Sequence, residues 1–560
     1  MPSVPNVKID YYYDYVELCK ALHNLAGSAP GLCRMHSIGT THEGRDIPVL
    51  EITDFNSGVP EEKPGYYVEA CTHAEEFCGT NIALNLIKTL LGSFGEREDI
   101  TLLLKNVIFY IVPRVNPDGV DTVMKTGYPG VSNGKYPIDE RQTLPGLYPT
   151  DLDGNHIIAQ MRIPDPDGEW KVSKKDPRLM IIREPYETEG QFYRMYPEGL
   201  IRGDTVGFDI PFTKDVNLNR NYPAGWMPEG MQYGACELPL SEPETNSVAH
   251  FIVAHPNIAG VISYHTNAGS ILRPFSNKSD DCFLGSDLAI YNALGNMGTK
   301  LLGYNFMSTY GGFTPDKTKM RGGTLNDWTF EFMGIPAICL ELWNVYDAAG
   351  TPRPKNYHFS AKDEDTDYAV LQWADREMGP SAYLDWKPFD HPQLGRVEIG
   401  GWNRIWVERN PPEKYLPDFA DKATVYTLRL AEVLPRLTIQ SAKAEKLAED
   451  LYKVSIVIRN SGYLPTYLTT QAKSVHADSP IKIFLLPHSG SIEVECCDHP
   501  IDIGHLEGRF GRDAEWSHDR NQWHPTERRA EWVIRTNDCK ALDFTASSPR
   551  CGAVHTTILL

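Results

Sequence analysis

The first three quarters of the chain alternate between helix-like and strand-like patterns of hydrophobic residues. Apolar positions at helical spacing predict helices over Tyr11 to Ala26, Asn81 to Leu91 and Asp287 to Leu302. Short apolar runs predict buried strands, which are Ile47 to Ile52, Tyr66 to Glu69, Asn106 to Pro113, Gly260 to Tyr264 and Ala337 to Leu342. This alternation indicates an α/β fold, with helices on both faces of a mixed, mostly parallel sheet.

Two regions depart from that alternation. Residues from about 126 to 215 are rich in Pro, Gly and Asp and show little periodicity. They predict a long functional insertion that lies over the domain surface and could rim a site. After an amphipathic helix over about Lys422 to Leu434, short β runs separated by turn residues predict a small C-terminal β-sandwich. We therefore expect two domains, 1–437 and 438–560.

Composition narrows the range of partners. A chain of 560 residues is too long for one hydrophobic core, and its net charge of −20 argues against a nucleic-acid partner. No run of about 18 apolar residues occurs, so we expect no transmembrane helix and no membrane partner. The N-terminus lacks the pattern of a secretory signal, and the 11 scattered cysteines read as reduced thiols. These features predict a cytoplasmic protein.

Three residues have the chemistry of a metal site. In VEACTHAEEF, His73 and Glu76 follow a predicted strand as a His-x-x-Glu pair, and His265 ends the strand in GVISYHTNAG. Zinc binds imidazole nitrogen and carboxylate oxygen, and a catalytic site usually has three protein ligands. Taken singly, each signal is weak: an isolated pair is typical of a surface His with a solvated Glu, and a lone His is often structural.

An acidic residue, Glu341, closes the apolar run PAICLELW. Burying a charge is costly unless the charge is paired, so a carboxylate at this position should have a partner or a function. A salt bridge at the edge of the sheet would provide one, and a catalytic role would provide another.

The order of these residues with three further segments is more specific. VPRVNPDG contains Asn116 to Gly119, VNLNRNYP contains Asn219 and Arg220, and RGGTLNDW spans Arg321 to Trp328. With IGTTHEGRDIPVLEI near the start, which looks like an opening hairpin, the series resembles the zinc carboxypeptidase family. The resemblance covers roughly residues 10 to 435.

The resemblance implies a function and the residues that perform it. One zinc ion per chain would be held by His73, Glu76 and His265, and Glu341 would be the general base for the attacking water. Asn219 and Arg220 would bind the free carboxylate of the substrate, a role that suits the two parallel hydrogen bonds of a guanidinium. The chain would thus be a metallocarboxypeptidase that hydrolyses the C-terminal bond of peptides.

The sequence also departs from the family pattern. Thr318 stands where the family commonly has a substrate-closing Tyr, and Tyr310 is a possible substitute. The stretch after Gly119 lacks the usual oxyanion-stabilising Arg, for which Arg162 in the insertion is our candidate. Arg114 and Arg273 are the alternatives.

Asn217 replaces the Asp that usually orients a zinc-binding His, so the same hydrogen bond is expected without the charge and with somewhat weaker metal binding. We interpret DLDGNH, which begins at Asp151, as an Asp-Gly turn and not a calcium loop. Cys71 and Cys78, beside the His-x-x-Glu pair, are expected to pack and not to bind metal.

Two other functions remain open. A zinc amidase acting on a small acyl-amino acid or a cell-wall peptide would use the same chemistry, and a binding protein could keep the fold without catalysis. The intact ligand set and base argue against the binding protein. Neither Leu325 nor Asn326 is acidic, which favours neutral C-terminal residues of the substrate over Lys or Arg.

Overall fold

The structure is a computed structural model that describes residues 5–136, 138, 145–203, 215–314, 316–318, 321–353, 363–510 and 526–560. Its centre is an eight-stranded sheet in the order β1-β2-β4-β3-β11-β14-β12-β13. These strands are β1 (Cys33–Thr40), β2 (Asp46–Ile52), β3 (Gly65–Ala70), β4 (Ile108–Val112), β11 (Ile258–Thr266), β12 (Ser270–Arg273), β13 (Asn305–Ser308) and β14 (Ala337–Leu342). The four central strands, β4, β3, β11 and β14, are parallel, which confirms the predicted mixed, mostly parallel sheet.

Helices cover both faces of this sheet. Tyr264 on β11 bonds Thr427 of α11 (Leu416–Glu432), and α11 packs against α2 (Cys78–Ser93) and α7 (Asp287–Leu302). On the other face, the ring of Tyr67 lies near Phe251 of α6 (Pro243–Ala254), while α8 (Leu325–Met333) packs on β14. The other helices of this part are α1 (Tyr15–Ser28), α3 (Glu98–Asn106) and α4 (Pro117–Thr126). Successive side chains of a strand alternate between the two faces, so His265 points to the face opposite Tyr264.

The predicted insertion contains strands. A second, six-stranded antiparallel sheet has the order β15-β16-β6-β9-β7-β8. It joins β6 (Gln160–Pro164), β7 (Trp170–Val172), β8 (Met180–Ile182) and β9 (Tyr193–Pro197) to β15 (Tyr383–His391) and β16 (Gly395–Trp402), beside α9 (Val345–Ala349) and α10 (Glu364–Glu377). A separate antiparallel pair, β5 (Gly146–Pro149) with β10 (Gly199–Arg202), lies on either side of β6 to β9 in the sequence. Little periodicity was visible in this region because the strands of the insertion are short and β6 pairs with β16, which lies more than 200 residues later.

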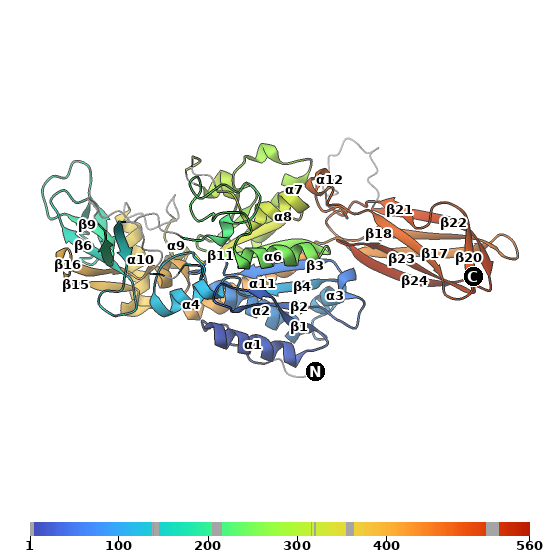
Figure 1. The fold of residues 1–560 in the computed structure, drawn as a ribbon, viewed down its shortest axis with the longest axis horizontal. Helices are drawn as coiled ribbons and strands as arrows, with labels where there is room; N and C mark the ends of the chain where they lie inside the picture. Colours follow the sequence, from blue (N-terminus) through green and yellow to red (C-terminus); the bar gives the residue numbers. More distant parts are fainter. Residues whose placement is uncertain are drawn as a thin grey trace.

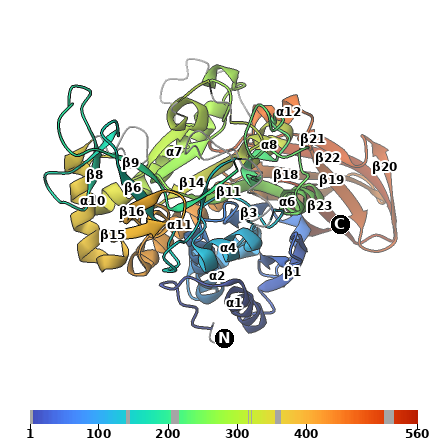
Figure 2. The same ribbon diagram turned by 60° about the vertical axis from the view of Figure 1, so that its left-hand side comes forward.

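The C-terminal part is all β, as predicted. One sheet has the order β17-β18-β22-β20 and the other β21-β19-β23-β24. The strands are β17 (Leu437–Lys446), β18 (Leu451–Asn460), β19 (Ile481–Pro487), β20 (Ser491–Cys496), β21 (Ile501–Gly504), β22 (Glu527–Asn537), β23 (Ala541–Ser548) and β24 (Gly552–Leu559). Apolar residues of both sheets, such as Ile456, Ile483, Trp532 and Phe544, form one core between them. These strands lie at one end of the molecule and the six-stranded sheet at the opposite end (Figures 1 and 2).

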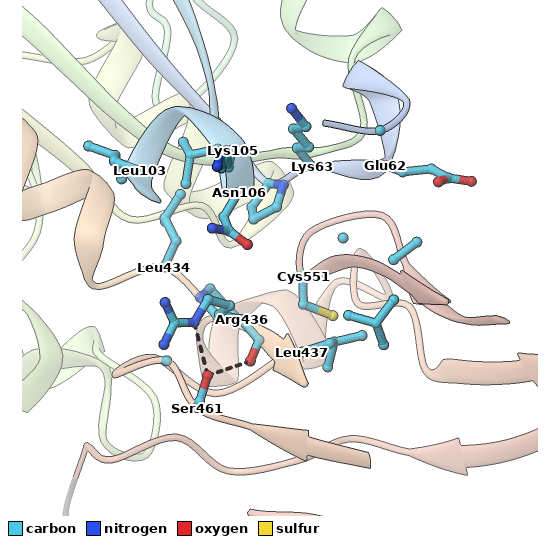
Figure 3. Close-up of a pocket in the computed structure, with 18 of the residues that line it drawn as sticks. Glu62, Lys63, Leu103, Lys105, Asn106, Leu434, Arg436, Leu437, Ser461 and Cys551 are labelled. Atoms are coloured by element: carbon cyan, nitrogen blue, oxygen red, sulfur yellow. Dashed lines mark hydrogen bonds between the residues drawn. The ribbon is translucent and has the colours of Figure 1, made fainter. Parts of the chain in front are cut away.

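The C-terminal sandwich contacts the central part at two places. A cleft of about 410 Å³ lies between them, with Lys63 and Leu103 on one side and Arg436, Ser461 and Cys551 on the other (Figure 3). Arg436 Nε donates to Ser461 Oγ at 3.0 Å within this wall.

The second contact is made by the short helix α12 (Thr470–Ser474). The backbone N–H groups of Thr470 and Gln471 donate to the buried carboxylate of Asp287, at 2.6 and 2.8 Å, and Thr469 Oγ1 donates to the Gly334 carbonyl. The sandwich is therefore attached to the ends of α7 and α8. We propose a domain boundary near residue 437, between the end of α11 and the start of β17.

Among the described residues, we find no helix with the length and apolar character needed to cross a membrane.

Candidate metal centre and active site

Three predicted metal ligands meet at one edge of the central sheet. His73 and Glu76 lie in the loop between β3 and α2, and His265 lies near the end of β11. The carboxylate of Glu76 lies between the imidazoles: Oε1 is 2.9 Å from Nδ1 of His73, and Oε2 is 2.9 Å from Nδ1 of His265. The two Nδ1 atoms are 3.2 Å apart. The carboxyl ends of parallel strands share one edge, which explains the convergence.

This donor set fits zinc. Ligand atoms on a tetrahedron with bonds of about 2.0–2.1 Å lie roughly 3.4 Å apart. The separation of the two Nδ1 atoms, 3.2 Å, is close to that value, and each Nδ1 lies 2.9 Å from a different oxygen of Glu76, so the carboxylate can face the ion with one or both oxygens. Two imidazole nitrogens and a carboxylate are also the ligand types that catalytic zinc sites use, and they leave one position open. The same geometry could hold another divalent transition metal with similar preferences.

Hydrogen bonds from neighbouring residues orient His73 and Glu76 for metal binding. Asn217 Oδ1 accepts a hydrogen bond from His73 Nε2 at 3.1 Å, which is the bond predicted for this Asn. The backbone N–H of Thr266 donates to Glu76 Oε2 at 3.2 Å. Burial would raise the pKa of Glu76, but the two imidazoles outweigh it and hold that pKa well below its usual range.

Glu341 lies beside this cluster, on the neighbouring strand β14. It is paired in register with His265, and only 8% of its surface is exposed. Burial, followed by repulsion from Glu76, raises the pKa of Glu341 to about 7. A carboxyl group with a pKa near neutrality can accept and return a proton at physiological pH.

His73, Glu76 and Glu341 line a cavity of about 250 Å³. The predicted substrate-binding residues Asn219 and Arg220 also line it, on the short 3-10 turn Leu218–Arg220. Asn219 Oδ1 accepts from the backbone N–H of Leu325 at 3.1 Å, which ties this turn to the start of α8. The cavity thus brings together the metal-ligand cluster, Glu341 and a guanidinium.

The arginine candidate from the insertion lies elsewhere. Arg162 is on β6, where its Nε donates to Glu398 Oε2 at 2.8 Å and its guanidinium faces the rings of Tyr193 and Trp386. It does not line the cavity.

The two alternative arginines are also held away from the site. Arg114 is buried and donates to Thr80 and to the Tyr13 carbonyl, and Arg273 is paired with Asp280. Neither residue lines the cavity.

Two cavity arginines were not among the predicted site residues. Arg409 ends the π-helix Ile405–Arg409, where its Nε lies 2.9 Å from Glu75 Oε1 and its Nη1 donates to Asn267 Oδ1 at 2.8 Å. Arg321 directly precedes Gly322. Arg321 begins the segment RGGTLNDW, but its sequence context assigned it no role, and Arg409 follows all the quoted motifs, so no sequence signal pointed to it.

Among the described residues, no tyrosine lines the cavity as a replacement for the substrate-closing Tyr. Thr318 is exposed and bonds Asp316, while Tyr310 does not line the cavity, although its neighbours Thr309 and Phe313 do. Residues 319 and 320, part of the same segment, lie outside the described residues.

The structure contains the turn predicted at Asp151, whose carboxylate also lies near those of Asp153 and Glu198. Asp151 accepts from the backbone N–H groups of Gly154, Asn155 and His156, which makes the expected turn. Cys71 donates to the Glu76 carbonyl at 3.3 Å, and both it and Cys78 are buried outside the metal-ligand cluster.

Known proteins resemble parts of this chain. The catalytic chain of human carboxypeptidase N is 29% identical over 255 residues, which are 40% of this chain and 54% of that protein. An inactive metallocarboxypeptidase of Talaromyces marneffei is 30% identical over 119 residues, 21% of this chain and 20% of that one. The chain matches between 7% and 54% of the length of such curated relatives.

Among solved structures, thrombin activatable fibrinolysis inhibitor has 16% identity and a TM-score of 0.44, over 76% of this chain and 74% of that one. Residues 436–559 match a domain of unknown function, DUF8731. Residues 18–356, more than half of the chain, match the family described as zinc carboxypeptidase. This chain therefore belongs to the zinc carboxypeptidase family.

Proposed function

We propose that this protein is a zinc-dependent metallocarboxypeptidase that releases the C-terminal residue of peptides. In this proposal His73, Glu76 and His265 hold one zinc ion, Glu341 is the general base, and Asn219 with Arg220 binds the free carboxylate of the substrate. One observation carries it: both Nδ1 atoms converge on Glu76 beside Glu341, in a cavity that also contains Arg220.

Zinc in this position supplies a Lewis acid that activates water near neutral pH and polarises the scissile carbonyl. The chain supplies proton transfer. Glu341 takes a proton from the attacking water and returns it to the leaving amine, help that is typically worth about 10² to 10⁴ in rate. Its pKa of about 7 suits both directions of transfer.

Arg409 is our proposal for the cation that stabilises the oxyanion, in place of Arg162. It lines the cavity that contains Glu341, whereas Arg162 is bound to Glu398 in the six-stranded sheet. Nearby Glu75 and Asn267 hold its guanidinium, so little reorganisation is needed when negative charge develops on the substrate.

Arg409 also borders a second cavity of about 430 Å³, lined by Phe77, Trp402 and Trp406 among others. This apolar space adjoins the site through Glu75 and Arg409. It is our candidate for binding the residues of a peptide that precede the scissile bond, because ligand pockets are commonly apolar with few polar groups.

Hydrolysis of N-blocked dipeptides tests this proposal. The metal-free protein, prepared with a strong chelator, should be inactive and should regain activity with one equivalent of zinc. Peptides whose C-terminus is amidated should not be cleaved, because they lack the carboxylate for Arg220. Cleavage of acyl amides without free carboxylates would favour the amidase, and absence of any hydrolysis by the zinc-loaded protein would favour a binding protein.

A further inference from the structure

Three arginines line the cavity of the active site, and two of them, Arg220 and Arg321, come from neighbouring segments. Arg220 comes from the turn Leu218–Arg220, and Arg321 comes from the segment before α8. Both residues are half-buried and both line the cavity. The proposed function gives roles to Arg220 and Arg409 but none to Arg321, so the presence of Arg321 requires a separate explanation.

The backbone fixes the two arginines as neighbours. The N–H of Tyr222 donates to the Gly323 carbonyl at 3.0 Å, and the N–H of Gly323 donates to the Ala224 carbonyl at 2.7 Å. Gly323 has a φ of +71°, and a Cβ there would lie 2.2 Å from the carbonyl oxygen of Arg220. The glycine therefore permits this close approach of the two segments.

A side chain strengthens the same junction. Gln232 Nε2 donates to the Gly322 carbonyl at 3.0 Å, and Gln232 Oε1 accepts from the Gly322 N–H at 2.7 Å. The residue next to Arg321 is thus held by two hydrogen bonds, and the position of the Arg321 backbone is well defined.

Neither guanidinium of this pair has a carboxylate in direct contact. Among the described residues, neither Arg220 nor Arg321 forms an ion pair within 4.0 Å; the carboxylate of Glu341 acts on both arginines, and that of Asp327 on Arg220, only from farther away. Burial, followed by repulsion from Arg321, lowers the pKa of Arg220 to about 10. The nearby carboxylate of Asp327 instead accepts a hydrogen bond from the Ser276 N–H at 2.9 Å. Partly buried, unpaired like charges are costly, and an anionic ligand would remove that cost.

We infer that the preferred substrate ends in glutamate or aspartate, whose α-carboxylate binds Arg220 and whose side-chain carboxylate binds Arg321. This inference rests on the proposed function and specifies its substrate class. It replaces the expectation of neutral terminal residues, which rested only on the uncharged side chains of Leu325 and Asn326. The cavity of about 250 Å³ has room for one terminal residue, and Phe313, whose ring lies 5.7 Å from the Arg321 guanidinium, borders the same space.

A pair of isosteric substrates separates this inference from simple binding of one carboxylate by both arginines. Glutamate and glutamine differ only in the charge of the side chain. For N-blocked dipeptides, we expect kcat/KM to be roughly 10- to 100-fold higher with terminal glutamate than with terminal glutamine, the range of one charge-assisted hydrogen bond. Arg321→Gln should reduce this ratio to near one, whereas Arg396→Gln, at an exposed position on β16, should leave the ratio unchanged.

The outcomes distinguish the inference from the function on which it rests. Equal kcat/KM values for the two peptides in the active wild-type enzyme would overturn the inference and leave the carboxypeptidase intact. If no peptide is hydrolysed, the proposed function fails, and calorimetry with N-acetyl-glutamate and N-acetyl-glutamine then tests the pocket alone. At least tenfold tighter binding of N-acetyl-glutamate, lost in Arg321→Gln, would support the acidic pocket, and equal binding would overturn it.

Discussion

Glu341 is paired in register with His265 on the adjacent parallel strands β14 and β11. In parallel strands, residues at paired positions point to the same face of the sheet, so the proposed base and a proposed zinc ligand are fixed by the same backbone hydrogen bonds. The relative position of the two groups therefore depends on rigid strands and not on loops. Both strands are fully buried, which limits their motion.

Asn217 should control the affinity for zinc. Replacing it with Ala removes the acceptor for His73 Nε2, and we expect zinc to bind roughly 10- to 100-fold more weakly. Asn217→Asp restores a charged acceptor and should bind zinc more tightly than the wild type. Competition with a chelator measures both, and Asn106→Ala, at an exposed position, is the control. Equal affinity of Asn217→Ala and the wild type would refute the role of this hydrogen bond.

Arg409 and Arg162 should differ in their effect on catalysis. For Arg409→Gln we expect kcat to fall by roughly 10²- to 10³-fold, as for loss of one oxyanion-stabilising donor, with a smaller change in KM. Arg162→Gln should change kcat by less than about threefold, because that residue lies outside the cavity.

Thermal unfolding of both variants provides the control, since each loses an ion pair, to Glu75 or to Glu398. A large loss of kcat in Arg162→Gln, with kcat of Arg409→Gln unchanged, would show that Arg162 and not Arg409 stabilises the oxyanion.

Asp327 should make stability depend on pH. Burial raises the pKa of its carboxyl to about 7, and its Oδ1 has no hydrogen-bond partner among the described residues. Because the folded state holds this proton more tightly than the unfolded state, the free energy of unfolding should decrease as pH rises from about 4 to about 7. Asn in this position cannot ionise but can still accept from the Ser276 N–H.

The comparison of wild type with Asp327→Asn isolates this effect. Over that pH range, the unfolding free energy of the wild type should fall relative to the variant by about 2–4 kcal/mol, as measured with urea at each pH. A pH-independent difference between the two proteins would show that the Asp327 carboxyl has an ordinary pKa.

Asp287 should stabilise the attachment of the C-terminal sandwich. Asp287→Ala leaves the N–H groups of Thr470 and Gln471 without their acceptor, and we expect a loss of about 1–3 kcal/mol in urea unfolding. Asp418→Ala, which removes an exposed ion pair with Lys422, should cost less than about 1 kcal/mol. If both variants unfold like the wild type, this contact contributes little.

Residues close in sequence, or at strand ends, were predictable. The helix predicted over Asp287 to Leu302 is α7 with those bounds. His73, His265 and Glu341 come together because β3, β11 and β14 are adjacent parallel strands, whose ends meet at one edge of the sheet. In α1, by contrast, Val16 fitted the helical pattern but is 74% exposed, since a single residue in a periodic pattern does not determine where the buried face ends.

Features that join distant segments were not predictable. Strand β6 pairs with β16, more than 200 residues later, and Arg409 reaches Glu75 across more than 300 residues. Neither contact leaves a local pattern, because ion pairs and short half-buried strands have no periodicity of their own. The adjacency of Arg220 and Arg321 likewise depends on backbone bonds around Gly323 that only the folded chain reveals.

The most direct test of the central claim is to measure zinc content and peptide hydrolysis on the same sample of Glu341→Gln. We predict one zinc ion per chain, as in the wild type, because the three proposed ligands are unchanged, together with a loss of about 10²- to 10⁴-fold in kcat. Hydrolysis by this variant at close to the wild-type rate, with zinc bound, would contradict the assignment of Glu341 as the general base and with it the proposed mechanism.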